Sequence, residues 1–261
     1  MVSSPHGEAP SPPILSVEGA RATIRLNRPR HHNRIETGDI AVLCELFARV
    51  EEDRRIRLLV LTATGRTFCA GFNLEELAPE RYDETAPRFD RMVDQLEALR
   101  VPTVAAVGGS LYGGGTDLAL ACDFRIGIPG IELMMPAGRI GVHYYYGGLR
   151  RYVTRLGLGA AKRLFLTAEK IDAEELLRIG FLDALVPAGE LAARVDALAE
   201  RLAAAAPIAV QGMKRALNNI AAGTADETAI ARAWRESMRS ADVAEGLAAL
   251  AEKRKPKFSD S

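Results

Sequence analysis

The sequence has few cysteines, no charge bias and no long apolar run, and each shortage excludes a class of protein. Its three cysteines, Cys44, Cys69 and Cys122, lie far apart and form no CxxC pair, so neither a disulfide framework nor a zinc site is indicated. Basic and acidic side chains number 34 each, which gives no net attraction to nucleic acid or to an anionic membrane. No stretch approaches the roughly 20 apolar residues that span a bilayer. We therefore expect a cytoplasmic protein with no metal, nucleic acid or membrane as partner.

The pattern along the chain predicts an α/β fold. Residues 1–13 are rich in proline and serine and contain no apolar signal region, so we expect a disordered tail. From Ile14 onward, short apolar runs such as 58–62 and 104–107 alternate with stretches of helical spacing such as 89–99. Beyond Leu149 the spacing is helical almost throughout. This order predicts a layered α/β core followed by a helical C-terminal part.

Two glycine-containing loops are the candidate binding elements. The glycines at 113–115 remove every Cβ where a loop turns into a predicted helix, and Ala70 with Gly71 makes similar room in an earlier loop. Backbone N–H groups at such positions can approach a ligand and hold a developing negative charge. A phosphate-binding P-loop is not indicated, because Gly115 stands where its lysine is required.

Several separated motifs resemble the crotonase superfamily of enoyl-CoA hydratases and isomerases. They occupy residues 68–74, 104–109, 113–123 and 244–258, and the resemblance covers the chain from about Ile14. It implies a spiral of β-β-α repeats with an acyl-CoA site over 14–200. It also implies a helical region at 201–261 that builds homotrimers or hexamers. The implied substrate is an acyl-CoA thioester, with coenzyme A entering as part of the substrate and no other cofactor.

The resemblance also implies the site residues. The family's oxyanion hole for the thioester corresponds to the N–H groups of Ala70 and Gly114. The residues implied to contact coenzyme A are Arg28, Arg30, Phe68, Ala70, Phe72, Asn73, Leu74, Trp234 and Lys253. Trp234 and Lys253 are expected near the adenine end, in the same chain or from a neighbouring subunit. Helical spacing also fits a core role for Trp234, and a basic run fits a solvated Lys253.

The acid–base residues depart from the family's usual pair of glutamates. Asp117 stands at the first position and Ala137, which cannot transfer a proton, at the second. One hypothesis is a hydratase or isomerase with Asp117 as its sole catalytic carboxylate. The usual two-glutamate hydration would require Glu132, Asp123 or a tyrosine in place of the second glutamate. The segment from Gly141 to Val186 also resembles family members that decarboxylate methylmalonyl-CoA. This resemblance implies a second hypothesis, an acyl-CoA decarboxylase in which Tyr144 orients the substrate carboxylate, although Phe72 stands where those members carry a histidine. The third is a non-catalytic acyl-CoA-binding paralogue.

Overall fold

Two sheets form the centre of the protein in a computed structural model that describes residues 12–77 and 88–259. Within that part, the larger sheet has six strands in the order β1-β2-β3-β5-β7-β10, and only the β1–β2 pair is antiparallel. The smaller sheet has the order β4-β6-β8-β9, with β8 and β9 antiparallel. The strands are β1 (Ile14–Glu18), β2 (Arg21–Leu26), β3 (Leu58–Ala63), β4 (Thr67–Cys69), β5 (Thr103–Val107), β6 (Ser110–Tyr112), β7 (Phe124–Gly127), β8 (Glu132–Met134), β9 (Ile171–Asp172) and β10 (Ala184–Leu185).

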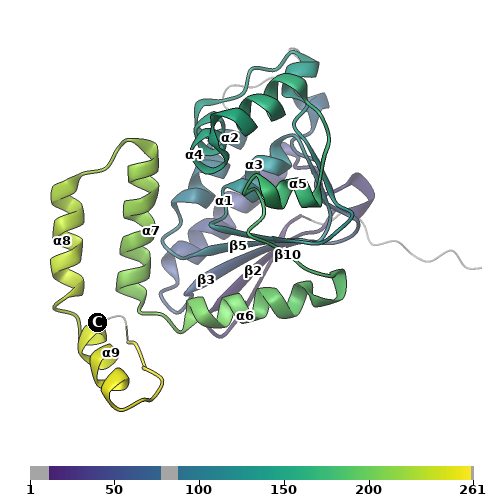
Figure 1. The fold of residues 1–261 in the computed structure, drawn as a ribbon. Helices are drawn as coiled ribbons and strands as arrows, with labels where there is room; N and C mark the ends of the chain where they lie inside the picture. Colours follow the sequence, from purple (N-terminus) through teal and green to yellow (C-terminus); the bar gives the residue numbers. More distant parts are fainter. Residues whose placement is uncertain (1–11, 78–87, 260–261) are drawn as a thin grey trace, which may run out of the picture.

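The helices complete a repeating unit of two strands and one helix. Successive units are β3-β4-α2, β5-β6-α3 and β7-β8-α4, and in each the first strand joins the larger sheet and the second the smaller. The predicted α/β spiral of β-β-α repeats is thereby confirmed (Figure 1). The helices are α1 (Thr37–Glu52), α2 (Phe89–Ala98), α3 (Gly114–Leu120), α4 (Tyr146–Lys162), α5 (Ala173–Arg178), α6 (Leu191–Ala203), α7 (Pro207–Ala222), α8 (Glu227–Ser237) and α9 (Ala241–Ala251).

The larger sheet is buried on both faces, because its apolar strands supply two cores. Leu59 and Leu61 of β3 belong to the main core, whereas Leu58 and Val60 face a second core. That second core includes Val195 and other side chains of α6, which covers one face of the sheet (Figure 1). The boundary predicted between residues 200 and 201 therefore falls inside α6, and the helical extension begins with α7.

The C-terminal helices α7, α8 and α9 project from one side of the core (Figure 1). Lys214 of α7 anchors them, since its Nζ donates to the Val101 carbonyl at 2.7 Å and pairs with Asp123 at 2.7 Å. Phe258, near the C-terminus, is held to the core because its carbonyl accepts a hydrogen bond from Arg57 at 2.8 Å. In residues 12–77 and 88–259, no helix is both long enough and apolar enough to cross a membrane.

Candidate functional site

The two glycine-containing loops meet at one edge of the smaller sheet. β4 and β6 are parallel neighbours, so the loop after Cys69 and the loop after Tyr112 emerge on the same side. A Cβ added to Gly71 would lie 2.7 Å from the backbone nitrogen of Gly114 and 2.8 Å from the Tyr112 carbonyl oxygen. Gly71 also has a φ of +89°, which L-residues with a side chain rarely adopt. Glycine at this position therefore allows direct backbone contact between the two loops.

The amide donors of the first loop differ in whether they are already occupied. The N–H of Ala70 donates to the His32 carbonyl at 2.9 Å, and that of Asn73 donates to the Ile35 carbonyl at 2.9 Å. Gly71 N–H contacts the Cys69 sulfur at 3.4 Å. Among the described residues, only the N–H of Phe72 has no acceptor in this loop. The prediction that the N–H of Ala70 is an oxyanion donor is therefore corrected, because this N–H already donates to the His32 carbonyl.

The N–H of Gly114 is a second backbone donor without an acceptor among the described residues. Gly114 is the first residue of α3, and helix starts leave N–H groups without intrahelical acceptors. No described residue accepts its hydrogen.

The thiol of Cys69, beneath the two loops, is not a nucleophile at neutral pH, since burial raises the pKa of Cys69 to about 12.

Aromatic rings pack beside Gly114. A Cβ on Gly114 would lie 2.7 Å from the ring of Phe89, the first residue of α2. The Phe89 ring centroid is 6.1 Å from that of Phe72 and 6.5 Å from that of Tyr145. Tyr145 in turn stacks on Tyr144 with centroids 4.4 Å apart. We call the rings of Phe72, Phe89, Tyr144 and Tyr145 the aromatic wall.

Asp117 lies one turn beyond Gly114 on α3 and is completely buried. Arg151 of α4, which is also 0% exposed, binds it through two bonds: Nε donates to Oδ1 at 2.9 Å and Nη2 donates to Oδ2 at 2.9 Å. The Tyr145 hydroxyl donates to Oδ2 as well. We expected Asp117 to contact a ligand directly, and this expectation is corrected because the side chain has no exposed surface. Asp117 is linked to the aromatic wall by its hydrogen bond with Tyr145.

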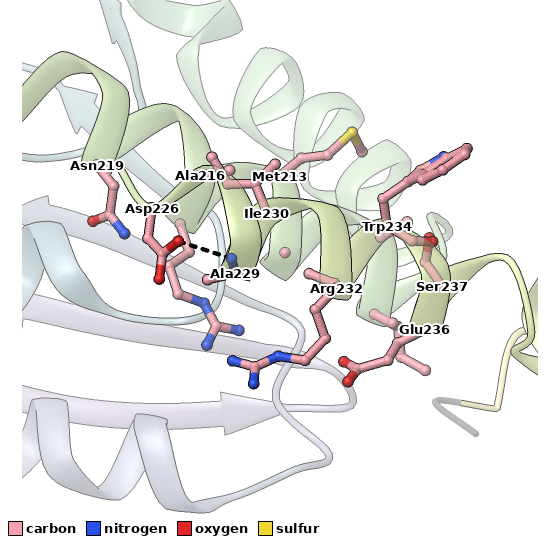
Figure 2. Close-up of a pocket in the computed structure, with 15 residues that line it drawn as sticks. Met213, Ala216, Asn219, Asp226, Ala229, Ile230, Arg232, Trp234, Glu236 and Ser237 are labelled. Atoms are coloured by element: carbon pink, nitrogen blue, oxygen red, sulfur yellow. Dashed lines mark hydrogen bonds between the residues drawn. The ribbon is translucent and has the colours of Figure 1, made fainter. Parts of the chain in front are cut away.

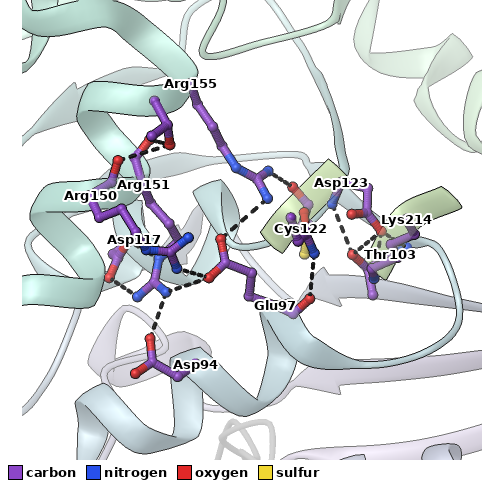
Figure 3. A network of polar contacts seen from close by, with 12 residues as sticks. Asp94, Glu97, Thr103, Asp117, Cys122, Asp123, Arg150, Arg151, Arg155 and Lys214 are labelled. Atoms are coloured by element: carbon purple, nitrogen blue, oxygen red, sulfur yellow. Dashed lines mark hydrogen bonds and ion pairs between the residues drawn. The ribbon is translucent and has the colours of Figure 1, made fainter. Parts of the chain in front are cut away.

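The Asp117–Arg151 pair belongs to a larger charge network between α2 and α4 (Figure 3). Nη1 of Arg151 donates to Asp94 at 2.7 Å and to Glu97 at 3.1 Å. Two further arginines of α4, Arg150 and Arg155, also pair with Glu97. The network therefore sets three arginines against three carboxylates, so its charges balance.

The two tyrosines next to Asp117 stay protonated at neutral pH. Burial, with the nearby Asp117 charge as the second cause, raises the pKa of both Tyr144 and Tyr145 above the ordinary value. The Tyr144 hydroxyl donates to the Tyr145 hydroxyl over a long 3.4 Å. Both side chains are half-buried, so each keeps a surface from which a ligand can be met.

Neither carboxylate considered as a replacement for the missing glutamate is free. Ala137 is buried where the second glutamate was expected. Glu132 accepts from the Tyr112 hydroxyl at 2.6 Å and from Lys170 at 2.7 Å, and the Lys170 bond is the main cause that lowers the pKa of Glu132. Asp123 accepts from the Thr103 N–H at 2.7 Å as well as pairing with Lys214. Both carboxylates are therefore already engaged with other groups of the fold, and a replacement of the second glutamate by a tyrosine stays a prediction.

The residues expected to contact coenzyme A differ in their availability. Arg28 is bound by Asp39 through Nε at 3.0 Å and Nη2 at 2.9 Å, a pairing that raises the pKa of Arg28. Phe68 is only 1% exposed and belongs to the main core. The Asn73 amide donates to Glu36 at 2.7 Å and fixes its loop. These three side chains serve the fold, whereas Arg30 and Leu74 are exposed.

Trp234 and Lys253 lie on the C-terminal extension, apart from the two loops. Trp234 is 65% exposed on α8 and lines a hollow of about 520 Å³ between α7 and α8. Figure 2 shows Trp234 and Met213 together on one side of this hollow. Lys253 is exposed just after α9. Within one chain, α8 and α9 project away from the core that carries the two loops (Figure 1).

Sequence reasoning did not single out three residues of this site: Phe89, Tyr145 and Arg151. Tyr145 is the middle residue of a run of three tyrosines, and nothing local distinguishes it from its neighbours. Arg151 follows Arg150 in a helix and has no sequence signal of burial. Phe89 was assigned only to a helical stripe, because its contact with Gly114 joins different elements.

Comparison with known proteins gives consistent matches over almost the whole chain. The family model described as enoyl-CoA hydratase/isomerase matches residues 17–261. The short-chain-enoyl-CoA hydratase of Clostridium acetobutylicum is 31% identical and the alignment covers 93% of this chain and 95% of that protein. The crotonyl-CoA hydratase of Syntrophomonas wolfei is also 31% identical, with 94% and 96% covered. The crystal structure of an enoyl-CoA hydratase from Bacillus anthracis superposes with a TM-score of 0.87 at 30% identity, covering 96% of this chain and all of that chain.

Proposed function

Because the chain belongs to the enoyl-CoA hydratase/isomerase family of enzymes, we propose that it acts on an acyl-CoA thioester through an enolate. The enolate oxygen accepts hydrogen bonds from the N–H groups of Phe72 and Gly114. The observation that carries this proposal is that these two amides have no acceptor among the described residues and lie on adjoining loops.

Fixed amide donors suit this chemistry because the thioester oxygen gains charge only as the reaction proceeds. Loss of one such donor in other enzymes costs about 3 to 4 kcal/mol of transition-state stabilisation. Coenzyme A enters as part of the substrate, and the proposal requires no further cofactor. Arg30 and Leu74, which are exposed, are the side chains proposed to contact it.

The reaction proposed first is hydration or double-bond isomerisation of an unsaturated acyl thioester. Asp117 provides the proton-transfer carboxylate, and Ala137 leaves no second one. A decarboxylase is the second candidate. It is favoured by the Tyr144 hydroxyl, whose only hydrogen bond to the part of the chain that the structure describes is a long 3.4 Å contact, so that the hydroxyl is available to a substrate carboxylate.

We further propose that α7, α8 and α9 form the contacts of a homotrimer or hexamer. Apolar side chains on these helices, Met213, Leu217 and Trp234 among them, are more than half exposed in the single chain. Removing such surface from water favours association. Trp234 and Lys253 would then reach the coenzyme A of a neighbouring subunit.

A test of the proposal measures the mass of the products formed from a panel of thioesters. The enzyme is incubated with crotonyl-, 3-enoyl-, dienoyl- and methylmalonyl-CoA, and with a saturated acyl-CoA in D₂O. A gain in mass of one water indicates hydration, a loss of CO₂ indicates decarboxylation, and deuterium at C2 indicates the enolate itself. Isomerisation leaves the mass unchanged and is followed by the ultraviolet absorbance of the conjugated 2-enoyl thioester. If calorimetry shows acyl-CoA binding but no thioester is converted or exchanged, the chain is a non-catalytic binding protein and the proposal fails.

A further inference from the structure

The buried carboxylate and the half-buried tyrosine beside it form a unit that the family's usual pair of glutamates does not explain. Asp117 has no exposed surface, and its Oδ1 and Oδ2 are both bound by Arg151. Among residues 12–77 and 88–259, the other side chain bound to it is Tyr145. A proton that moves between Asp117 and an acyl group must therefore pass through the Tyr145 hydroxyl, unless the α3–α4 packing opens.

We propose that Tyr145 is the catalytic residue that exchanges protons with the acyl group, with Asp117 as its proton acceptor and Arg151 as a positioning residue. The inference rests on the proposed enolate chemistry and names the group that carries out its proton transfer. It also narrows the substrate class to thioesters whose reaction consists of moving one proton along the acyl chain.

Tyr145 is placed between the carboxylate and the free amides. Its hydroxyl binds Asp117, and the edge of its ring contacts Phe89 at a centroid distance of 6.5 Å. Phe89 in turn lies against Gly114, whose N–H is one of the two proposed oxyanion donors. An acyl group attached to a carbonyl at Gly114 therefore passes along the aromatic wall that contains Tyr145.

The proton transfer balances without a further reactant. As the C2–H bond of a 3-enoyl thioester breaks, its proton goes to the Tyr145 oxygen, while the Tyr145 proton goes to Oδ2 of Asp117. The electron pair of that bond moves into the thioester and forms the enolate. In the return step Tyr145 delivers a proton to C4 and recovers one from Asp117, and the double bond moves from C3–C4 to C2–C3.

Arg151 fits this cycle because it does not depend on Asp117 alone. When Asp117 is protonated, Nη1 of Arg151 still pairs with Asp94 and Glu97. The negative charge that leaves Asp117 appears on the enolate, so the site as a whole gains no charge. A buried arginine left without a partner would oppose the step strongly.

One proton-transfer unit suits a 1,3-shift better than hydration. Hydration by the usual route needs one group for the water and another for the α-carbon, and the buried Ala137 supplies neither. A shift along the chain needs a single group that accepts a proton and returns it. The structure therefore points to a β,γ-unsaturated acyl thioester as the substrate.

The experiment compares Tyr145→Phe with Tyr146→Phe on a 3-enoyl-CoA. The first variant removes one hydroxyl and keeps the ring. The second is the matched control: its side chain is 77% exposed, and no hydrogen bond or ring contact joins that side chain to the described residues of the proposed machinery. We expect Tyr145→Phe to lower kcat by about 100-fold or more, with KM and Tm little changed. Tyr146→Phe should match the wild type.

An isotope measurement separates a proton-transfer role from a structural one. With substrate deuterated at C2, the wild type should return part of the label to C4, and the residual activity of Tyr145→Phe should not. Wild-type-like turnover and label transfer in Tyr145→Phe would overturn the inference, as would loss of activity confined to Tyr144→Phe. A wild type that neither exchanges nor converts any thioester would instead overturn the proposed function itself.

Discussion

One half of the site consists of main-chain amides and the other half of side chains. The half at Phe72 and Gly114 consists of main-chain amides that the fold leaves without acceptors. The half around Asp117 consists of side chains that are all engaged with one another, through Arg151 and Tyr145. The first half depends on where the backbone runs and requires few residue identities. The second depends on each residue, and it is there that this chain departs from the two-glutamate arrangement.

The largest expected effect tests whether the side-chain half is held together by charge. Arg151→Met leaves the Asp117 carboxylate buried without its partner, and breaking such a pair typically costs about 3 to 5 kcal/mol. We expect the free energy of unfolding, measured with urea, to fall by that amount. Arg178→Gln, which breaks an exposed ion pair with Glu175, is the control and should leave it nearly unchanged.

A double variant distinguishes charge from packing. Asp117→Leu combined with Arg151→Met removes both charges, and apolar replacements of buried ion pairs are often neutral or stabilising. Stability should return toward that of the wild type while activity does not. If the double variant is as unstable as Arg151→Met alone, the pair contributes shape rather than charge balance, and the contrast between the two halves is weakened.

The same contrast explains what could be predicted from the sequence. The glycine loops and the alternation of strands and helices were predictable, because small residues and short apolar runs act locally. The β-β-α order followed from the resemblance of the ordered motifs to a known family. The free amide was misplaced at Ala70, because its acceptor, His32, lies in a distant loop. The Asp117–Arg151 pair joins residues 34 apart, and no local pattern states which faces of α3 and α4 meet. Strands as short as Thr67–Cys69 likewise depend on their sheet partners.

The next largest expected effect concerns the main-chain half, where the loops of Gly71 and Gly114 are in contact. Gly71→Ala would place a Cβ 2.7 Å from the Gly114 nitrogen and 2.8 Å from the Tyr112 carbonyl, so the loops must separate. Displacing an oxyanion donor costs about 100- to 1,000-fold in kcat, and we expect C2 exchange in D₂O to fall by that factor. Gly130→Ala is the matched control, since it has a φ of +81° but open space around it. Equal losses in both variants would mean that backbone strain, not the loop contact, is responsible.

The smallest expected effect concerns the aromatic wall, where the two halves meet. Phe89 lies on Gly114 and contacts the rings of Phe72 and Tyr145, so it limits the space beside the carbonyl. Phe89→Leu should open that space. We expect the ratio of kcat/KM for a longer acyl chain over a four-carbon one to rise about tenfold, the scale of one or two methylenes in an apolar pocket. A series of thioesters of increasing length measures it.

Phe124→Leu provides the comparison for this last change. Phe124 is a half-buried phenylalanine packed on the second core, so its replacement lowers stability without touching the aromatic wall. A shift in chain-length preference confined to Phe89→Leu would show that the wall sets the acyl limit. An unchanged preference would mean that the acyl group leaves the carbonyl in another direction. Tyr145 would then lie off its path, and the proton-transfer role assigned to it would lose its geometric basis.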